Sequence, residues 1–147
     1  MIEESIIAQL PYTKPFLFVD EIFEVEDTHI LGGYQFKQDE YFYKGHFKDN
    51  PVTPGVILTE CMAQIGLVCF GIYLLKGEWN EQAYGVAMTS NEINFYTPVF
   101  PGEKVTVKAN KIYFRFNKLK CTVEMHNSKG VLVAKGIVSG VAFNKKE

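Results

Sequence analysis

Residues 45–64 read GHFKDNPVTPGVILTECMAQ, and this stretch decides the fold. It joins a histidine and a proline-containing turn to the start of an apolar segment that carries one carboxylate, Glu60. The segment continues over residues 56–75 as VILTECMAQIGLVCFGIYLL, with apolar side chains at nearly every position around a helix. A helix of this kind is either enclosed by protein or spans a membrane.

Two polar side chains decide between these alternatives. Glu60 and Gln64 are four residues apart and therefore share one face of the helix. A carboxylate in the middle of a bilayer is unfavourable by roughly 3 kcal/mol or more. The flanks also lack the aromatic and basic residues that anchor a membrane span. We therefore expect no membrane span, but a central helix enclosed by a sheet.

The start of this helix has the features of a reactive site. Thr53 is expected to cap the helix and Pro54 to occupy its first position, which leaves Gly55 with a free N–H. Such an electropositive end can receive a carbonyl oxygen that gains negative charge. With His46 across the turn and Glu60 further along the helix, the stretch predicts a site for proton abstraction next to a carbonyl.

Periodicity indicates the remaining elements. One long helix followed by consecutive antiparallel strands predicts the α+β class. The expected short helix covers residues 2–10, and the expected strands cover residues 16–25, 28–37, 83–96, 104–116, 118–127 and 131–143. A bulge is expected near Asp20 and Glu21, a bend or a close contact at Gly32 and Gly33, and a hairpin loop at residues 127–130.

Composition excludes several classes of protein. The formal net charge of −2 gives no basis for nucleic acid binding. The acidic N-terminus does not match the pattern of a signal peptide. Cys61, Cys69 and Cys121 are odd in number and lack CxxC spacing, so we expect buried, inert thiols in a reducing compartment.

Two further blocks, LPYTKPFLFVDEI at residues 10–22 and NFYTPVFPGEKV at residues 94–105, flank the first in order. Together the three blocks closely resemble the 3-hydroxyacyl-acyl carrier protein dehydratases of bacterial fatty acid synthesis. The resemblance covers most of residues 1–147, as a single domain. It implies the hot-dog fold, in which a curved antiparallel sheet wraps a long helix.

The resemblance also implies roles for individual residues. His46 would remove the proton at C2 of a 3-hydroxyacyl thioester, and Glu60 would handle the departing hydroxyl. The Gly55 N–H, helped by Val56, would polarise the thioester carbonyl. The remaining substrate-binding roles would fall to Gln64, which supports the carboxylate, and to Phe47 and Tyr43.

The resemblance further implies a cytoplasmic enzyme that needs no metal or other cofactor. Its partner would be the acyl carrier protein. It would form a homodimer or an assembly of dimers, in which the histidine and the glutamate of one site come from different subunits.

Other interpretations stay open at this point. His46 could be a turn histidine, and Glu60 could pair with a lysine. The chain could be a hot-dog acyl thioesterase or a non-catalytic acyl-binding subunit. Departures from the family pattern, at Lys48, Thr53, Thr59, Asn94, Tyr96 and Thr97, suggest a specialised polyene or polyketide-like pathway as an alternative to fatty acid synthesis. The Thr59 hydroxyl would either contact the acyl chain or bond back to a helix carbonyl.

Overall fold

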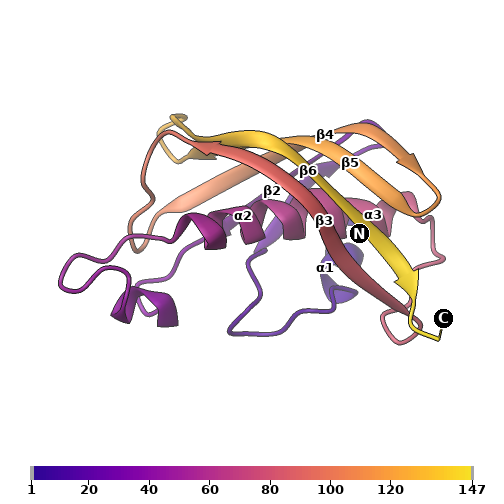
Figure 1. Cartoon of the computed structure of the whole chain (residues 1–147), viewed down its shortest axis with the longest axis horizontal. Coiled ribbons are helices and arrows are strands. Elements are labelled where there is room, and N and C mark those ends of the chain that lie inside the picture. The colour runs from indigo at the N-terminus through magenta and orange to yellow at the C-terminus, as the bar shows by residue number, and fades with distance from the viewer. Residues whose placement is uncertain (1, 147) are drawn as a thin grey trace.

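The structure is a computed structural model that describes residues 2–146 of the chain. One long helix lies along the concave side of a six-stranded antiparallel sheet (Figure 1). This arrangement confirms the expected α+β class and the wrapped helix of the hot-dog fold. The strands are β1 (Glu21–Val25), β2 (His29–Gln35), β3 (Tyr84–Phe95), β4 (Lys104–Arg115), β5 (Lys118–Asn127) and β6 (Leu132–Asn144), in the spatial order β1-β2-β4-β5-β6-β3.

The central helix runs over Gly55–Leu74 without interruption. It consists of α2 (Gly55–Ala63), a π-helical turn η2 (Gln64–Cys69) and α3 (Phe70–Leu74). Its length and composition would permit a membrane span, but 67% of its most apolar window is buried inside the protein. Fully buried side chains such as Ile65 and Phe70 each stabilise the fold by about 1.5–3 kcal/mol. The helix is thus the core of the domain, as expected.

Glycine allows this helix to lie close to the sheet. A Cβ atom on Gly66 would be 3.1 Å from the side chains of both Ala109 and Val123, on β4 and β5. A Cβ atom on Gly32 would be 3.0 Å from the Ile65 side chain. The close contact expected at Gly32 is therefore confirmed, and both glycines set the spacing between helix and sheet.

The expected cap at Thr53 is wrong. Pro54 occupies the N-cap position and makes no side-chain cap hydrogen bond. The Thr53 hydroxyl instead lies 2.6 Å from the Tyr43 hydroxyl, and both side chains are buried. The Thr53 N–H donates to the carbonyl of Val99. Because this threonine is held from two other elements, it cannot turn toward the helix start.

The first strand is shorter than expected. It begins at Glu21, and its bulge lies between Ile22 and Glu24 rather than at Asp20 and Glu21. The preceding residues are tied to the central helix, because the Phe18 N–H donates to the Gln64 side chain at 2.8 Å. The other strands lie within about two residues of their expected bounds. The short elements are α1 (Ile2–Ala8) and the 3-10 turn η1 (Tyr41–Lys44).

The two edges of the sheet differ. β1 has five residues, two of them glutamates, and carries a bulge. β3 has twelve residues, and only Glu92 among them is charged. Its side chains are largely exposed, including Met88 at 42% and Phe95 at 48%. The β1 edge is thus protected against pairing with another strand by its shortness, charge and bulge, whereas β3 is long and weakly charged.

Candidate active site

His46 lies on a loop that Val52 closes. The Val52 N–H donates to the His46 carbonyl at 2.8 Å, and the Val52 carbonyl lies 2.9 Å from His46 Nδ1. A carbonyl oxygen only accepts hydrogen bonds, so Nδ1 carries the proton and Nε2 keeps a free lone pair. In the neutral form of this imidazole, Nε2 is therefore the nitrogen that can accept a hydrogen bond or a proton.

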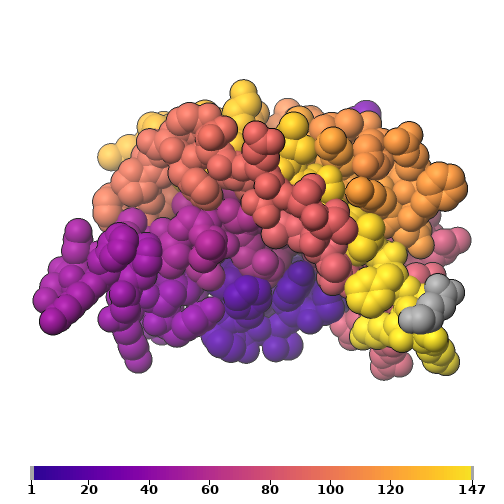
Figure 2. Space-filling model, in the orientation of Figure 1, coloured from indigo at the N-terminus to yellow at the C-terminus, as the bar shows by residue number. Residues whose placement is uncertain are grey.

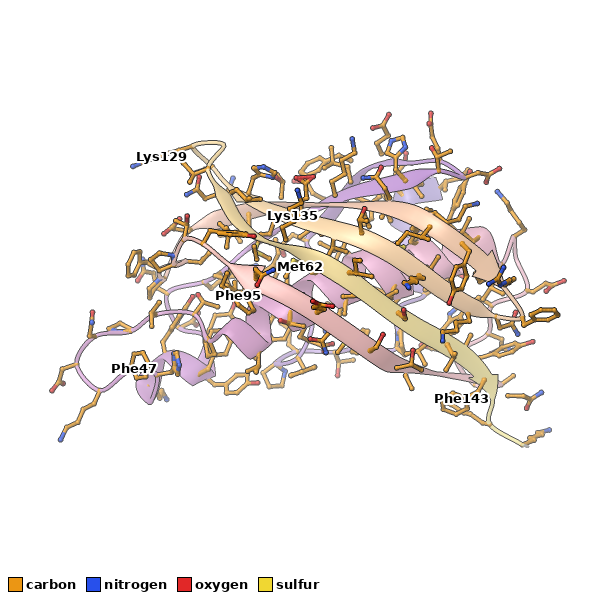
Figure 3. The ribbon with its side chains drawn as sticks, turned by 45° about the horizontal axis from the view of Figure 1, so that its top comes forward. Phe47, Met62, Phe95, Lys129, Lys135 and Phe143 are labelled. Atoms are coloured by element: carbon orange, nitrogen blue, oxygen red, sulfur yellow. The ribbon has the colours of Figure 1, made fainter. Side chains whose placement is uncertain are left out.

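The same loop projects away from the sheet. Phe47 stacks on the His46 ring, with 4.1 Å between the ring centroids, and is 58% exposed. Figure 3 shows Phe47 on this loop, beyond the end of the sheet at the left of the view. The loop that carries His46 thus exposes Phe47 to solvent, while His46 itself is partly buried.

The start of the central helix has free backbone donors. The first helical hydrogen bonds come from Ile57 and Leu58, whose N–H groups donate to the Pro54 carbonyl at 2.9 and 3.1 Å. Within residues 2–146, the N–H groups of Gly55 and Val56 donate to no protein acceptor. Two unpaired donors at a helix N-terminus favour a bound oxygen with negative charge.

Glu60 is held by the glutamine one turn further along. Gln64 Nε2 donates to Glu60 Oε2 at 3.0 Å and to the Phe16 carbonyl at 3.0 Å. Gln64 itself is fully buried. Burial raises the pKa of the Glu60 carboxyl above its ordinary range, and the hydrogen bond from Gln64 partly offsets that rise. A carboxyl in this state keeps a proton more readily than an exposed one and can act as an acid.

Glu60 forms part of the wall of a cavity of about 310 Å³. The cavity extends along the central helix, past Leu67 and Gly71, to Leu75 and Trp79. Its other walls are β3, β6, the turn between β4 and β5, and the segment that carries Tyr12 and Phe16. Figure 2 shows atoms of the central helix (magenta) between β3 (salmon) and the N-terminal segment (indigo).

Among the predicted site residues, Gln64 is hydrogen-bonded to Glu60, and Phe47 stacks on His46. Gly55 and Val56 lie at the helix start, one turn or more before the carboxylate. His46 and Phe47 do not line the cavity that contains Glu60. Tyr43 does not line it either. Its hydroxyl is bonded to Thr53, and burial raises the pKa of Tyr43 to about 12.

Of the residues that line this cavity, only Glu60 was predicted from the sequence, and those missed include Tyr12, Gly71 and Trp79. Tyr12 stands within the family-like block of residues 10–22, and Trp79 is the sole tryptophan of the chain. Gly71 interrupts a strongly apolar helix, which was a usable signal. Among residues 2–146, no cluster of three or more His, Cys, Asp or Glu residues could hold a metal ion.

The sequence matches one family model and is similar to known members of the same enzyme class. A family model described as a FabA-like domain matches residues 10–138. The 3-hydroxyacyl-[acyl-carrier-protein] dehydratase FabZ of Herpetosiphon aurantiacus is 37% identical over 138 residues, covering 90% of this chain and 92% of the relative.

Two solved structures share the fold at low sequence identity. The dehydratase heterocomplex ApeI:P of Xenorhabdus doucetiae matches with a TM-score of 0.80 and 16% identity, covering 96% of this chain and 93% of that chain. A thioesterase from Haemophilus influenzae matches with a TM-score of 0.59 and 19% identity, covering 86% and 80%. The fold therefore occurs in proteins named for two different reactions, and fold alone does not separate them.

Proposed function

The chain belongs to the FabA-like domain family, and on that premise we propose that it removes water from a 3-hydroxyacyl thioester carried by acyl carrier protein. The product is the trans-2-enoyl thioester. The observation that carries this proposal is Glu60, a carboxyl with a raised pKa that is held by Gln64 in the wall of an elongated, mostly apolar cavity. The sequence identity of 32–37% to 3-hydroxyacyl-[acyl-carrier-protein] dehydratases supports the same activity.

The proposed reaction uses two side chains and the helix start. His46 Nε2 takes the proton from C2, and the electrons of that C–H bond form the C2–C3 double bond. The C3–O bond breaks, and protonated Glu60 gives its proton to the departing hydroxyl, which leaves as water. The N–H of Gly55, helped by that of Val56, stabilises negative charge on the thioester oxygen. Positioned acid and base groups of this kind contribute about 100- to 10,000-fold each.

We propose that one site uses His46 of one subunit and Glu60 of another. His46 lies on a loop that projects from its own chain, and it is absent from the cavity that contains Glu60. β3 offers a long, unprotected edge for pairing with a second copy, and Phe95 and Tyr96 expose apolar surface there. A homodimer, or an assembly of dimers, would bury this surface and bring the two groups together.

The proposal extends to recognition of the carrier protein and to the pathway. Lys44 and Lys48 flank His46 and are exposed, which suits an acidic carrier protein in the cytoplasm. The specialised polyene or polyketide-like pathway gains no support from the threonines. The Thr53 hydroxyl bonds to Tyr43, and the Thr59 hydroxyl donates to the Gly55 carbonyl at 3.0 Å. Neither side chain lines the cavity.

The test uses 3-hydroxyacyl and 2-enoyl thioesters with detection by mass spectrometry. Loss or gain of water supports dehydration, free acid indicates the thioesterase alternative, and tight binding without change indicates an acyl-binding subunit. Mixing inactive His46→Ala and Glu60→Gln proteins then tests the shared site. Exchange of subunits should restore one intact site of the two in each mixed dimer if each site uses two chains. A mixture that stays inactive after confirmed exchange would contradict the shared site.

A further inference from the structure

Gly71 is anomalous within the central helix. Glycine is unfavourable in a helix interior unless packing or a ligand requires it. Gly66, one turn earlier, has such a reason because β4 and β5 lie against it. A Cβ atom built on Gly71 would meet nothing within 4 Å, and Gly71 lines the cavity that contains Glu60. No packing contact within the described chain explains this glycine.

The missing side chain keeps the cavity continuous. Glu60 stands toward one end of the cavity, and Leu75 and Trp79 stand at the other, with Gly71 between them along the helix. Any larger side chain at position 71 would project into this space. The cavity is mainly apolar, so the part beyond Gly71 suits hydrocarbon rather than a polar group.

Trp79 forms a rigid end to the cavity. Its indole N–H donates to the Gln9 carbonyl at 3.0 Å, and its ring stacks on Tyr84. The side chain is 7% exposed. Because it is fixed from two other segments, Trp79 is placed to limit the depth of the cavity rather than to swing aside.

The geometry points to Gly71 and Trp79 as the residues that set acyl-chain length: Gly71 admits the chain past the middle of the helix, and Trp79 stops it. This inference rests on the proposed function for the identity of the ligand. Gly71 lies eleven residues beyond Glu60, or about 16 Å along the helix. That span corresponds to about a dozen carbons of an extended chain, taking about 1.25 Å of advance per carbon from C–C bonds of about 1.5 Å. Acyl chains of this length or longer should reach the space beyond Gly71.

The binding test needs no turnover, because Trp79 is the sole source of tryptophan fluorescence. Saturated butanoyl, octanoyl, dodecanoyl and hexadecanoyl pantetheine thioesters serve as probes with the full-length protein. We expect a saturable change in fluorescence with the two long chains and none with butanoyl. Gly71→Leu should abolish the change. A wild-type signal that does not depend on chain length, or a long-chain signal that survives in Gly71→Leu, would overturn the inference.

The activity test compares variants on 3-hydroxyacyl thioesters of the same lengths. Gly71→Leu should lower the ratio of long- to short-chain kcat/KM by about tenfold or more, and Gly71→Ala by less, as expected for blocking a pocket by successive carbons. Thr59→Leu is the control, because it places the same leucine side chain on the same helix outside the cavity. A larger shift in Thr59→Leu than in Gly71→Leu would refute the assignment.

The two readouts separate this inference from the proposed function. Length-dependent fluorescence without dehydration would leave the chain-length role standing and remove the proposed reaction. Dehydration without length-dependent fluorescence would leave the proposed reaction standing and remove the chain-length role of Gly71 and Trp79. Light scattering covers one more alternative: if Gly71→Leu dissociates the assembly and leaves chain-length selectivity unaltered, Gly71 is a subunit contact and the inference is wrong.

Discussion

Glu60→Gln should make the protein more stable while it removes catalysis. In the folded protein, burial raises the pKa of the Glu60 carboxyl, so its ionised form is disfavoured relative to the unfolded chain. At neutral pH the unfolded chain releases this proton fully, which pulls the equilibrium toward unfolding. A glutamine has no charge to desolvate, and its carbonyl oxygen can still accept the hydrogen bond from Gln64.

The magnitude follows from the partial burial of the carboxyl. Each unit of raised pKa corresponds to about 1.4 kcal/mol. The carboxyl faces a cavity and is incompletely buried, so solvent screening reduces its penalty. We therefore expect a gain of about 1 kcal/mol in the free energy of unfolding, or about 3–4 °C in Tm for a chain of this size.

The sign changes with pH in a defined way. A carboxyl whose folded pKa is raised contributes stability below its unfolded pKa, about 4.3, and loses that contribution as the pH rises through its folded pKa. The advantage of Glu60→Gln should thus be full at neutral pH and vanish in acid. Thermal unfolding by circular dichroism across this pH range, at matched protein concentration, measures the difference. Equal stability of the two proteins at pH 7, or an advantage that grows in acid, would refute the reasoning.

Three further predictions test other contacts. Tyr43→Phe and Thr53→Val should each lower the free energy of unfolding by about 1–2 kcal/mol. Because both substitutions remove the same buried hydrogen bond, the two losses should not add in a double-mutant cycle, and additive losses would contradict the pairing. Gln64→Leu should destabilise the fold by about 2–5 kcal/mol, since the Phe18 N–H and the Phe16 carbonyl lose a buried partner. The same substitution should raise the pKa of Glu60 further, so that the basic limb of the pH–rate profile moves to higher pH. A basic limb that does not move would mean that Glu60 is not the titrating acid. The three cysteines are buried, and burial raises the pKa of each thiol, that of Cys121 to about 12. An aromatic disulfide reagent should therefore label the cysteines only at the rate at which the protein unfolds. Fast labelling of the native protein would show that at least one cysteine is accessible.

Much of the fold could be predicted because its signals are local and repeated. The apolar run of residues 56–75 has only one carboxylate and no proline, so its length and its burial both follow from the pattern. The alternation over β4 and β5 predicts half-buried strands, and their observed bounds agree within about one residue. The Glu60–Gln64 contact was predictable because residues four apart meet on one helix face.

The errors arise where a distant side chain competes with a local rule. Thr53 is a good cap by type, but Tyr43, ten residues earlier, takes its hydroxyl. The strand expected from residue 16 starts at Glu21, because Gln64 takes the Phe18 N–H from 46 residues away. Neither competitor can be found from neighbouring residues.

The cavity was missed for a different reason. It depends on the absence of a side chain at Gly71 and on the position of Trp79, which follows the helix in a turn of irregular backbone. A periodicity argument ranks residues by the apolar surface that they add. Periodicity alone does not identify the space that a glycine leaves empty, and the available signal was Gly71 itself within an apolar helix.

The open edge of β3 has a consequence for handling the protein. Edge strands that stay solvent-exposed in natural proteins are commonly short or carry lysine, proline or inward-pointing charge. Over Tyr84–Phe95 the chain has neither lysine nor proline, and Glu92 supplies its one charge. A protomer whose β3 edge stays unpaired is therefore a template for ordered aggregation, and substitutions that weaken the proposed pairing with a second copy should give precipitate rather than soluble monomer. A lysine placed on this strand should discourage both the aggregation and the pairing with a second copy.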